Sequence, residues 1–168
     1  YEAQPADEGP LRIGIVADTR RITAPDDVVF TASVAGENQD GLHFYWDLGN
    51  GTVDGAGLDE VTRSYNAAGI YTVSLTVSNS LGTGASVSRD RYVMAGPLSL
   101  YVAPEGTSIP PYGDWDTALN DIHWAFENAG PGDTLYLAGR TYPLNRPLMF
   151  ASSNVTVKGG YAAGGGAG

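Results

Sequence analysis

Residues 44–51, with the sequence FYWDLGNG, decide the fold of the first half of this chain. An aromatic run followed by an acid and two nearby glycines is typical of a strand that enters a tight turn. Trp46 is large enough to fill the space between two sheets, and Gly49 and Gly51 can adopt positive φ angles. Asp47 can accept hydrogen bonds from the backbone amides of the turn. We therefore expect these residues to have a structural role.

Outward from this segment, apolar and polar residues alternate along the chain. Residues 71–78 (YTVSLTVS) are the clearest case, because every second side chain is apolar and no helical period fits. Similar strands are expected at residues 11–16, 27–34, 42–48 and 85–94, with turn residues between them. Short strands at this spacing predict two antiparallel sheets that pack face to face.

Beyond Pro97 the alternation ends and one helical stretch follows. In residues 114–129 apolar side chains recur at helical intervals, at Trp115, Leu119, Ile122 and Phe126. This spacing predicts an amphipathic helix that begins at a cap formed by Asp114 or Asp116 and ends at Gly130.

Short strands are also expected at residues 100–102, 134–137, 147–150 and 154–158. The chain is therefore divided into a linker or extended arm (1–10), a β-sandwich (11–96) and a second region (97–168) that ends in a Gly-rich tail.

The composition excludes several classes of function. The 168 residues have a net charge of −10, without a basic cluster, so nucleic-acid binding is not expected. There is no cysteine, which removes disulfides and thiolate metal sites. The chain has no apolar run near the roughly 20 residues of a membrane-spanning helix, so membrane insertion is not expected. Abundant Gly, Ser and Thr with sparse charge favour a secreted or cell-surface protein.

Residues 44–51, followed by Tyr65, Gly69 and the strand at 71–79, closely resemble a PKD domain. That family has a W-D-F-G-D-G turn followed by a Y-x-x-x-G-x-Y-x-V-x-L-x-V strand, and this chain departs from it at Leu48 and Asn50. The resemblance implies an immunoglobulin-like sandwich of extracellular proteins, commonly a spacer or a module that contacts protein or carbohydrate. The motif positions are Trp46, Asp47, Gly49, Asn50, Gly51, Tyr65, Gly69 and Tyr71.

A second resemblance covers residues 100–161. The segments YVAPEG, WDTA, GDTLYL, GRTY and NVTVKGGY, in this order, look like the entrance to a right-handed parallel β-helix. The resemblance implies a capping helix at about 114–129 and a first coil at about 133–161. The expected fold class is mainly β, with an immunoglobulin-like antiparallel sandwich, a partial right-handed β-helix and one capping α-helix.

The polar residues form no constellation typical of catalysis. His43 and His123 have no spacing partner for a metal or a nucleophile. Adjacent acids such as Asp114 and Asp116 are interpreted as solvated charges or helix caps. We therefore expect no enzyme activity and no cofactor.

One metal alternative stays open at this stage. The oxygen ligands of Asp47, Asn50 and Asp54 could gather around a calcium ion. Asn50 and Asn154 also begin N-x-T sequons, which matter only in a eukaryotic source.

Aromatic residues are the candidates for contact with a ligand or partner. Tyr112, Trp115 and Trp124, together with Tyr101, could form a platform on which a sugar stacks near the helix. Trp115 falls on the apolar stripe, whereas Trp124 lies off it and is the better candidate for exposure. The predicted contact residues are Trp124, Tyr45 and Tyr112.

These observations predict a non-enzymatic extracellular structural or adhesion module that acts by protein–protein packing. A single coil leaves strand edges and an apolar layer unpaired, because solenoids generally need about three repeats. The expected partners are copies of the chain, as an oligomer in a filament or surface layer, or further domains of a longer chain. The alternatives are the amino-terminal portion of a secreted polysaccharide-degrading β-helix enzyme and a carbohydrate-binding module.

Overall fold

The structure is a computed structural model that describes residues 10–36 and 38–162, and it is mainly β. The chain divides into two compact units. The first contains residues 10–20, 27–65 and 71–93, and the second contains residues 21–26, 66–70 and 94–162.

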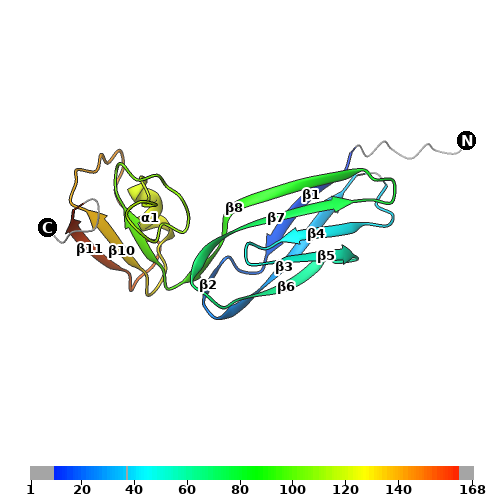
Figure 1. Cartoon of the computed structure of the whole chain (residues 1–168), viewed down its shortest axis with the longest axis horizontal. Helices are drawn as coiled ribbons and strands as arrows, with labels where there is room; N and C mark the ends of the chain where they lie inside the picture. Colours follow the sequence, from blue (N-terminus) through cyan, green and yellow to red (C-terminus); the bar gives the residue numbers. More distant parts are fainter. Residues whose placement is uncertain (1–9, 37, 163–168) are drawn as a thin grey trace, which may run out of the picture. The chain divides into compact units, whose positions relative to one another are not determined.

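The first unit is built from two sheets (Figure 1). One sheet has the order β1-β3-β6 and contains β1 (Arg12–Ala17), β3 (Asp26–Ala35) and β6 (Glu60–Tyr65). The other contains β5 (Thr52–Ala56), β4 (His43–Asp47), β7 (Gly69–Ser78) and β8 (Gly84–Gly96), in that order. β1 pairs with β3, and β4 pairs with β5 and β7, in each case antiparallel.

The sandwich core follows the predicted alternation. On β7 the side chains of Val73, Leu75 and Val77 are fully buried, and each stabilises the fold by roughly 1.5–3 kcal/mol relative to exposure. The ring centroid of Phe30 on β3 lies 6.2 Å from that of Trp46 on β4, which joins the two sheets, and 6.5 Å from that of Tyr65 on β6. The sandwich prediction is therefore confirmed.

Three strands were not expected from the sequence: β2 (Arg21–Thr23), β5 and β6. β5 contains Asp54 and Gly55, which are turn residues by propensity, yet its backbone pairs with β4 along five residues. The expected strand at residues 147–150 is wrong, because this segment has no regular secondary structure.

The second unit contains a parallel sheet of three strands, which are β9 (Ser99–Val102), β10 (Thr134–Ala138) and β11 (Thr156–Tyr161). β10 lies in the middle and pairs in parallel with both neighbours. In the same unit, β2 pairs in parallel with residues 94–96, at the end of β8.

The expected helix at 114–129 is too long. The observed helix, α1, spans Ile122–Asn128, and the side chain of Asp121 caps it by accepting a 3.0 Å hydrogen bond from Trp124 N–H. Asp114 does cap a turn, because its Oδ1 accepts a 2.8 Å hydrogen bond from Thr117 N–H. The chain then extends, and Leu119 N–H donates to the carbonyl of Tyr101 at 2.8 Å. The helical spacing at Trp115 and Leu119 was therefore coincidental.

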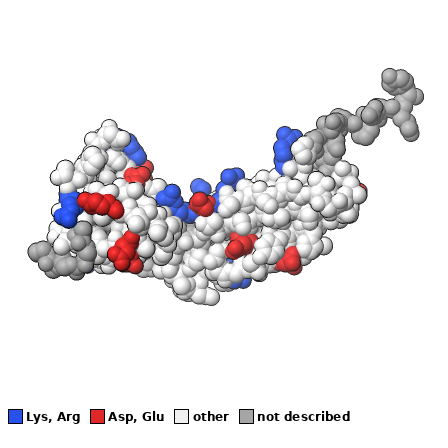
Figure 2. Space-filling view, turned by 45° about the horizontal axis from the view of Figure 1, so that its top comes forward, with Lys and Arg blue, Asp and Glu red and all other residues white. Residues whose placement is uncertain are grey.

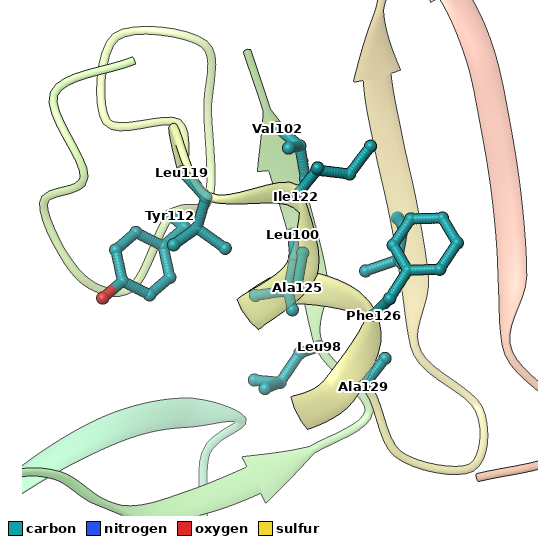
Figure 3. Close-up of a cluster of buried hydrophobic side chains, with 10 residues drawn as sticks. Leu98, Leu100, Val102, Tyr112, Leu119, Ile122, Ala125, Phe126 and Ala129 are labelled. Atoms are coloured by element: carbon teal, nitrogen blue, oxygen red, sulfur yellow. The ribbon is translucent and has the colours of Figure 1, made fainter. Parts of the chain in front are cut away.

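A hydrophobic core lies between α1 and the parallel sheet (Figure 3). Ile122, Ala125 and Phe126 of α1 belong to one buried cluster with Leu100 and Leu135 of the sheet. This contact explains why a helix of only seven residues is stable, because tertiary packing rather than helix propensity holds it.

One buried charge organises this unit. Asp133, directly before β10, is fully buried and forms an ion pair with Arg21 of β2. Its carboxylate also accepts hydrogen bonds from the N–H groups of Leu98, at 2.7 Å, and Gly130, at 2.9 Å. Asp133 thereby fixes the starts of β2, β9 and β10 relative to one another.

Candidate functional site

The motif residues of the sandwich have structural roles. Asp47 Oδ1 accepts a 3.0 Å hydrogen bond from Gly49 N–H, which closes the turn after β4. The hydroxyl of Tyr65 donates to the carbonyl of Leu48 at 2.8 Å, and burial raises the pKa of this phenol. Trp46 is fully buried.

The remaining motif positions support the same turn. Gly49 has a φ of 78°, and a Cβ there would lie 2.7 Å from a backbone oxygen, so only glycine fits. Gly51 also has positive φ, at 149°. Gly69 begins β7, and the ring of Tyr71 packs 4.7 Å from that of Tyr65.

The three residues considered for calcium have other partners. The side chain of Asn50 donates to the carbonyl of Ser64 at 2.9 Å and accepts from Arg63 Nε at 2.7 Å. Asp54 lies 3.4 Å from His43 at the surface. Within residues 10–36 and 38–162, no group of three His, Cys, Asp or Glu side chains could hold a metal ion.

The three expected contact residues have different environments. Tyr45 on β4 is 45% exposed and is available for contact. Tyr112 is 1% exposed and belongs to the core of the second unit, so its prediction as a contact residue is wrong. Trp124 is half-buried and packs against that core, with its ring 5.6 Å from that of Tyr112. The apolar face of the short helix is therefore wider than the sequence stripe indicated.

The parallel sheet has an apolar column that changes from buried to exposed. Leu100, Leu135 and Val157 are neighbours across β9, β10 and β11. Leu100 is 1% exposed and Leu135 is fully buried, whereas Val157 is 41% exposed. In the described part of the chain, β11 ends the sheet, and no strand pairs with its outer edge. The core column is thus left uncovered at its last position.

The opposite face of the sheet has an aromatic column. The rings of Tyr101 and Tyr136 stack 4.8 Å apart, and Nζ of Lys158 lies 5.4 Å from the Tyr136 ring centroid. Trp115 packs edge-on against Tyr101, and Tyr161 contacts both Trp115 and Tyr136. The aromatic platform expected from the sequence includes Tyr101 and Trp115 but not Tyr136 and Tyr161. Tyr136 lies in the predicted strand at 134–137, whereas Tyr161 lies beyond the predicted strand at 154–158, because the observed β11 extends to residue 161.

The other edge of the sheet is closed. Tyr101 N–H donates to the carbonyl of Tyr112 at 2.9 Å, and Ala103 N–H donates to that of Leu119 at 2.8 Å. Together with the hydrogen bond from Leu119 N–H to the carbonyl of Tyr101, these contacts occupy the outward-facing backbone groups of Tyr101 and the N–H of Ala103. The sheet therefore has one capped edge and one open edge.

Exposed apolar side chains gather in the segment that leads to β11. Four of the eight large hydrophobic residues that are exposed in the described chain fall within residues 144–157, namely Leu144, Met149, Phe150 and Val157. Isolated exposed residues such as Val16, at 57%, are ordinary on a protein surface, whereas these four fall within 14 residues of sequence.

This segment is held against α1. His123 Nε2 lies 3.0 Å from the carbonyl of Arg146, and the Arg146 guanidinium forms an ion pair with Glu127. The hydrogen bond from Arg146 lowers the pKa of Glu127. The ring of Phe150 lies 4.7 Å from that of Phe126. The exposed apolar residues are thus presented on an anchored loop.

The charged residues form no large patch of one sign on the face drawn in Figure 2. Figure 2 shows a face on which acidic and basic side chains are scattered in small groups among neutral residues. None of the helices in the described residues is both long and apolar enough to cross a bilayer.

The sandwich region matches a known family model. The family model described as PKD domain matches residues 14–89, which confirms the resemblance found in the sequence. No curated protein matches the chain.

Several solved structures are similar to the sandwich. The PKD1 domain of Vibrio anguillarum Epp is 23% identical, with a TM-score of 0.43, over 53% of this chain and 99% of that domain. The PKD domain of the human VPS10 domain-containing receptor SorCS2 is 19% identical, with a TM-score of 0.41, over 58% of this chain and 82% of that one. A structure of carbohydrate-binding modules from the β-sandwich superfamily is 21% identical, with a TM-score of 0.45, over 55% of this chain and 37% of its own.

Proposed function

We propose, from the premise that residues 14–89 form a PKD domain, that this protein is a non-catalytic extracellular module that acts by protein–protein packing. The sandwich serves as a spacer, as is common for such domains. The second unit supplies the docking surface, which we define as the outer edge of β11 together with Leu144, Met149, Phe150 and Val157.

The observation that carries this proposal is the exposure of Val157. Val157 continues a column whose other two members are at most 1% exposed, yet it is itself 41% exposed. Covering such a side chain is favourable by about 25 cal/mol for each Å² removed from water. An open strand edge adds unpaired N–H and C=O groups that a partner strand can satisfy. A second polypeptide that binds here gains both contributions.

The order of the strands supports the same proposal. β9, β10 and β11 are successive in the chain and adjacent in the sheet, all in parallel, and only the β9 edge is capped. We propose that this unit is the entrance of a right-handed parallel β-helix. A solenoid of so few strands needs further strands to bury its core, which accounts for the open edge.

Carbohydrate contact is a second candidate, favoured by the aromatic cluster on the outer face of the sheet. Tyr101, Trp115, Tyr136 and Tyr161 are all half-buried and adjoin one another. Aromatic side chains with one solvent-exposed side are suited to stacking on a sugar ring. A glycan-array signal that is lost in Trp115→Ala and kept in Tyr45→Ala would favour this candidate.

A peptide selection tests the docking proposal. Random peptides displayed on phage are selected on the immobilised chain, and the binders are measured against Val157→Lys and against Val16→Lys. Val16 is the matched control, because it is also an exposed strand valine, at 57% against 41% for Val157, and it lies in the sandwich. We expect the selected peptides to bind Val157→Lys at least about tenfold more weakly than the wild type, which is a loss of about 1.4 kcal/mol in binding free energy. We expect them to bind Val16→Lys with unchanged affinity.

Hydrogen exchange locates the peptides on the chain. We expect bound peptides to slow exchange of the β11 amides and to leave those of β4 unchanged. Binders that protect only the sandwich, or that tolerate Val157→Lys, would show that the docking surface lies elsewhere.

A further inference from the structure

Building on the docking surface proposed above, we infer the chemistry of its partner. The geometry points to a strand of a different polypeptide that runs parallel to β11, with an aliphatic residue beside Val157 followed by an aromatic residue beside Lys158.

The register of the sheet carries this inference. Each of the three strands contributes the same kinds of residue in the same order, namely Ser99-Leu100-Tyr101, Thr134-Leu135-Tyr136 and Thr156-Val157-Lys158. A hydroxyl residue is followed by an aliphatic residue that faces the core and then by a residue of the aromatic column. Cross-strand neighbours on one face are the unit of sheet stabilisation, so a fourth strand binds best when it repeats this order.

Lys158 determines which kind of residue the partner strand should have at its third position, beside Lys158 itself. It is the only lysine in the chain, it is exposed, and its amine already lies 5.4 Å from the ring centroid of Tyr136. An aromatic ring on the partner strand would contact the same amine from the other side by a cation–π interaction. A basic residue at this place would instead be repelled, because like charges directly opposite each other destabilise a sheet.

The parallel direction follows from the existing sheet. Both pairs in it are parallel, and purely parallel sheets are over-represented among known sheets. The paired stretch is short, because β11 has a bulge. Tyr136 pairs with Lys158 but Ala138 pairs with Tyr161, so β11 has one extra residue at Gly159–Gly160. Gly160 has a φ of 88° there. Regular pairing is therefore limited to residues 156–158.

A second copy of this chain does not supply the strand. β9 has the required order, but the outer backbone groups of Tyr101 and Ala103 are bonded to residues 112 and 119, and its inner side pairs with β10. Two β11 strands related by a two-fold axis through Val157 would place Lys158 opposite Thr156 and remove the aromatic contact. We therefore expect the chain to remain monomeric, in contrast to the filament or oligomer considered from the sequence.

Synthetic peptides test the pattern on the full chain. The probe is a labelled peptide with the sequence of residues 97–104 (PLSLYVAP), which contains the Ser-Leu-Tyr order of β9. The controls are the reversed sequence PAVYLSLP and a variant with lysine in place of the tyrosine. Fluorescence anisotropy measures the affinity of each.

We expect the forward peptide to bind more tightly than the reversed one, and the lysine variant to bind at least about fivefold more weakly. Val157→Lys should abolish the differences in affinity among the three peptides, whereas Val16→Lys should preserve these differences. Tighter binding of the reversed peptide, or equal binding of the lysine variant, would overturn the inferred partner.

The two proposals fail in distinguishable ways. If phage-selected peptides of another pattern protect β11 while the probe does not bind, the inferred partner is wrong and the docking surface stands. If no peptide protects β11, the docking surface itself is wrong. Light scattering that detects a dimer of the wild type, lost in Val157→Lys, would make a second copy the occupant and also overturn the inference.

Discussion

The two units bury their cores by different means. In the sandwich, Val73, Leu75 and Val77 lie on a middle strand and are fully buried, because a second sheet covers their face. In the second unit, one short helix and its neighbouring loops cover the first two members of the apolar column, and Val157 stays 41% exposed. An antiparallel sandwich is thus complete by itself, whereas a parallel sheet covered by one short helix leaves its last strand available for a partner.

Removing the buried carboxylate of Asp133 should produce the largest difference in stability between the two units. Asp133→Ala deletes the partner of Arg21 and leaves two backbone N–H groups without an acceptor. We expect a loss of about 3–5 kcal/mol in the free energy of unfolding of the second unit, measured by denaturant titration. Hydrogen exchange should show β10 opening while β4 and β7 stay protected.

Asp18→Ala is the matched control in the sandwich. The Asp18 carboxylate also accepts two backbone hydrogen bonds, from Thr19 and Val29, but it is exposed. Replacing Asp18 should lower the free energy of unfolding of the sandwich by about 1 kcal/mol. If Asp133→Ala opened β4 and β7 as readily as β10, the two units would unfold as one and the contrast between them would not hold.

The next largest loss of stability is expected from a change at Gly49, in the turn after β4 of the sandwich. Gly49→Ala forces a Cβ to within 2.7 Å of the Thr72 carbonyl oxygen at a φ of 78°, so we expect a loss of about 2–4 kcal/mol. Gly57→Ala is the control, because Gly57 has a φ of 68° with nothing within 4 Å of the added methyl group. Its cost should be about 1 kcal/mol, from the backbone alone. Equal losses in thermal denaturation would show that Thr72 moves aside.

A smaller effect is expected at the buried phenol of the sandwich. Tyr65→Phe removes the hydrogen bond to Leu48, and we expect a loss of about 1 kcal/mol. Because burial raises the pKa of Tyr65, its contribution is complete below pH 10 and declines at higher pH, where the unfolded chain loses the phenolic proton first. Unfolding curves between pH 8 and about 11 should therefore fall more steeply for the wild type than for Tyr65→Phe. Parallel curves would contradict the role assigned to this group.

The contrast between the units also explains what could be predicted from the sequence. The strand at 71–78 was found because alternation along a half-buried strand is local information. The edge strand β5 was missed because pairing with β4, rather than its own residues, makes it a strand. The helix was placed too early because the spacing at Trp115 and Leu119 cannot show that Leu119 bonds to β9.

The open edge was only partly predictable. The sequence predicts an unfinished apolar layer, but for the other end it predicts a cap formed by the helix alone. The backbone of Tyr112 and Leu119 closes the β9 edge, and the irregular residue pattern of this segment does not indicate these main-chain hydrogen bonds. The ion pair between Arg21 and Asp133 was also invisible, because 112 residues separate the two side chains.

The smallest expected effect concerns the loop that presents the exposed apolar residues. Glu127→Gln removes the ion pair with Arg146, and because both side chains are solvated, we expect the free energy of unfolding to change less than in Tyr65→Phe. Amides of residues 144–151 should nevertheless exchange faster, since one of the links between the loop and α1 is lost while the contacts of His123 and Phe126 remain. Glu105→Gln, which affects an exposed pair with Arg140, should leave these amides unchanged.

The ion pair between Glu127 and Arg146 should also depend on pH. Because Arg146 lowers the pKa of Glu127, the ion pair is fully formed above the ordinary pKa range of a glutamate and is lost as the pH falls through the lowered pKa. The wild type and Glu127→Gln should therefore exchange alike in strong acid, and a difference that persisted there would mean that the ion pair does not anchor the loop.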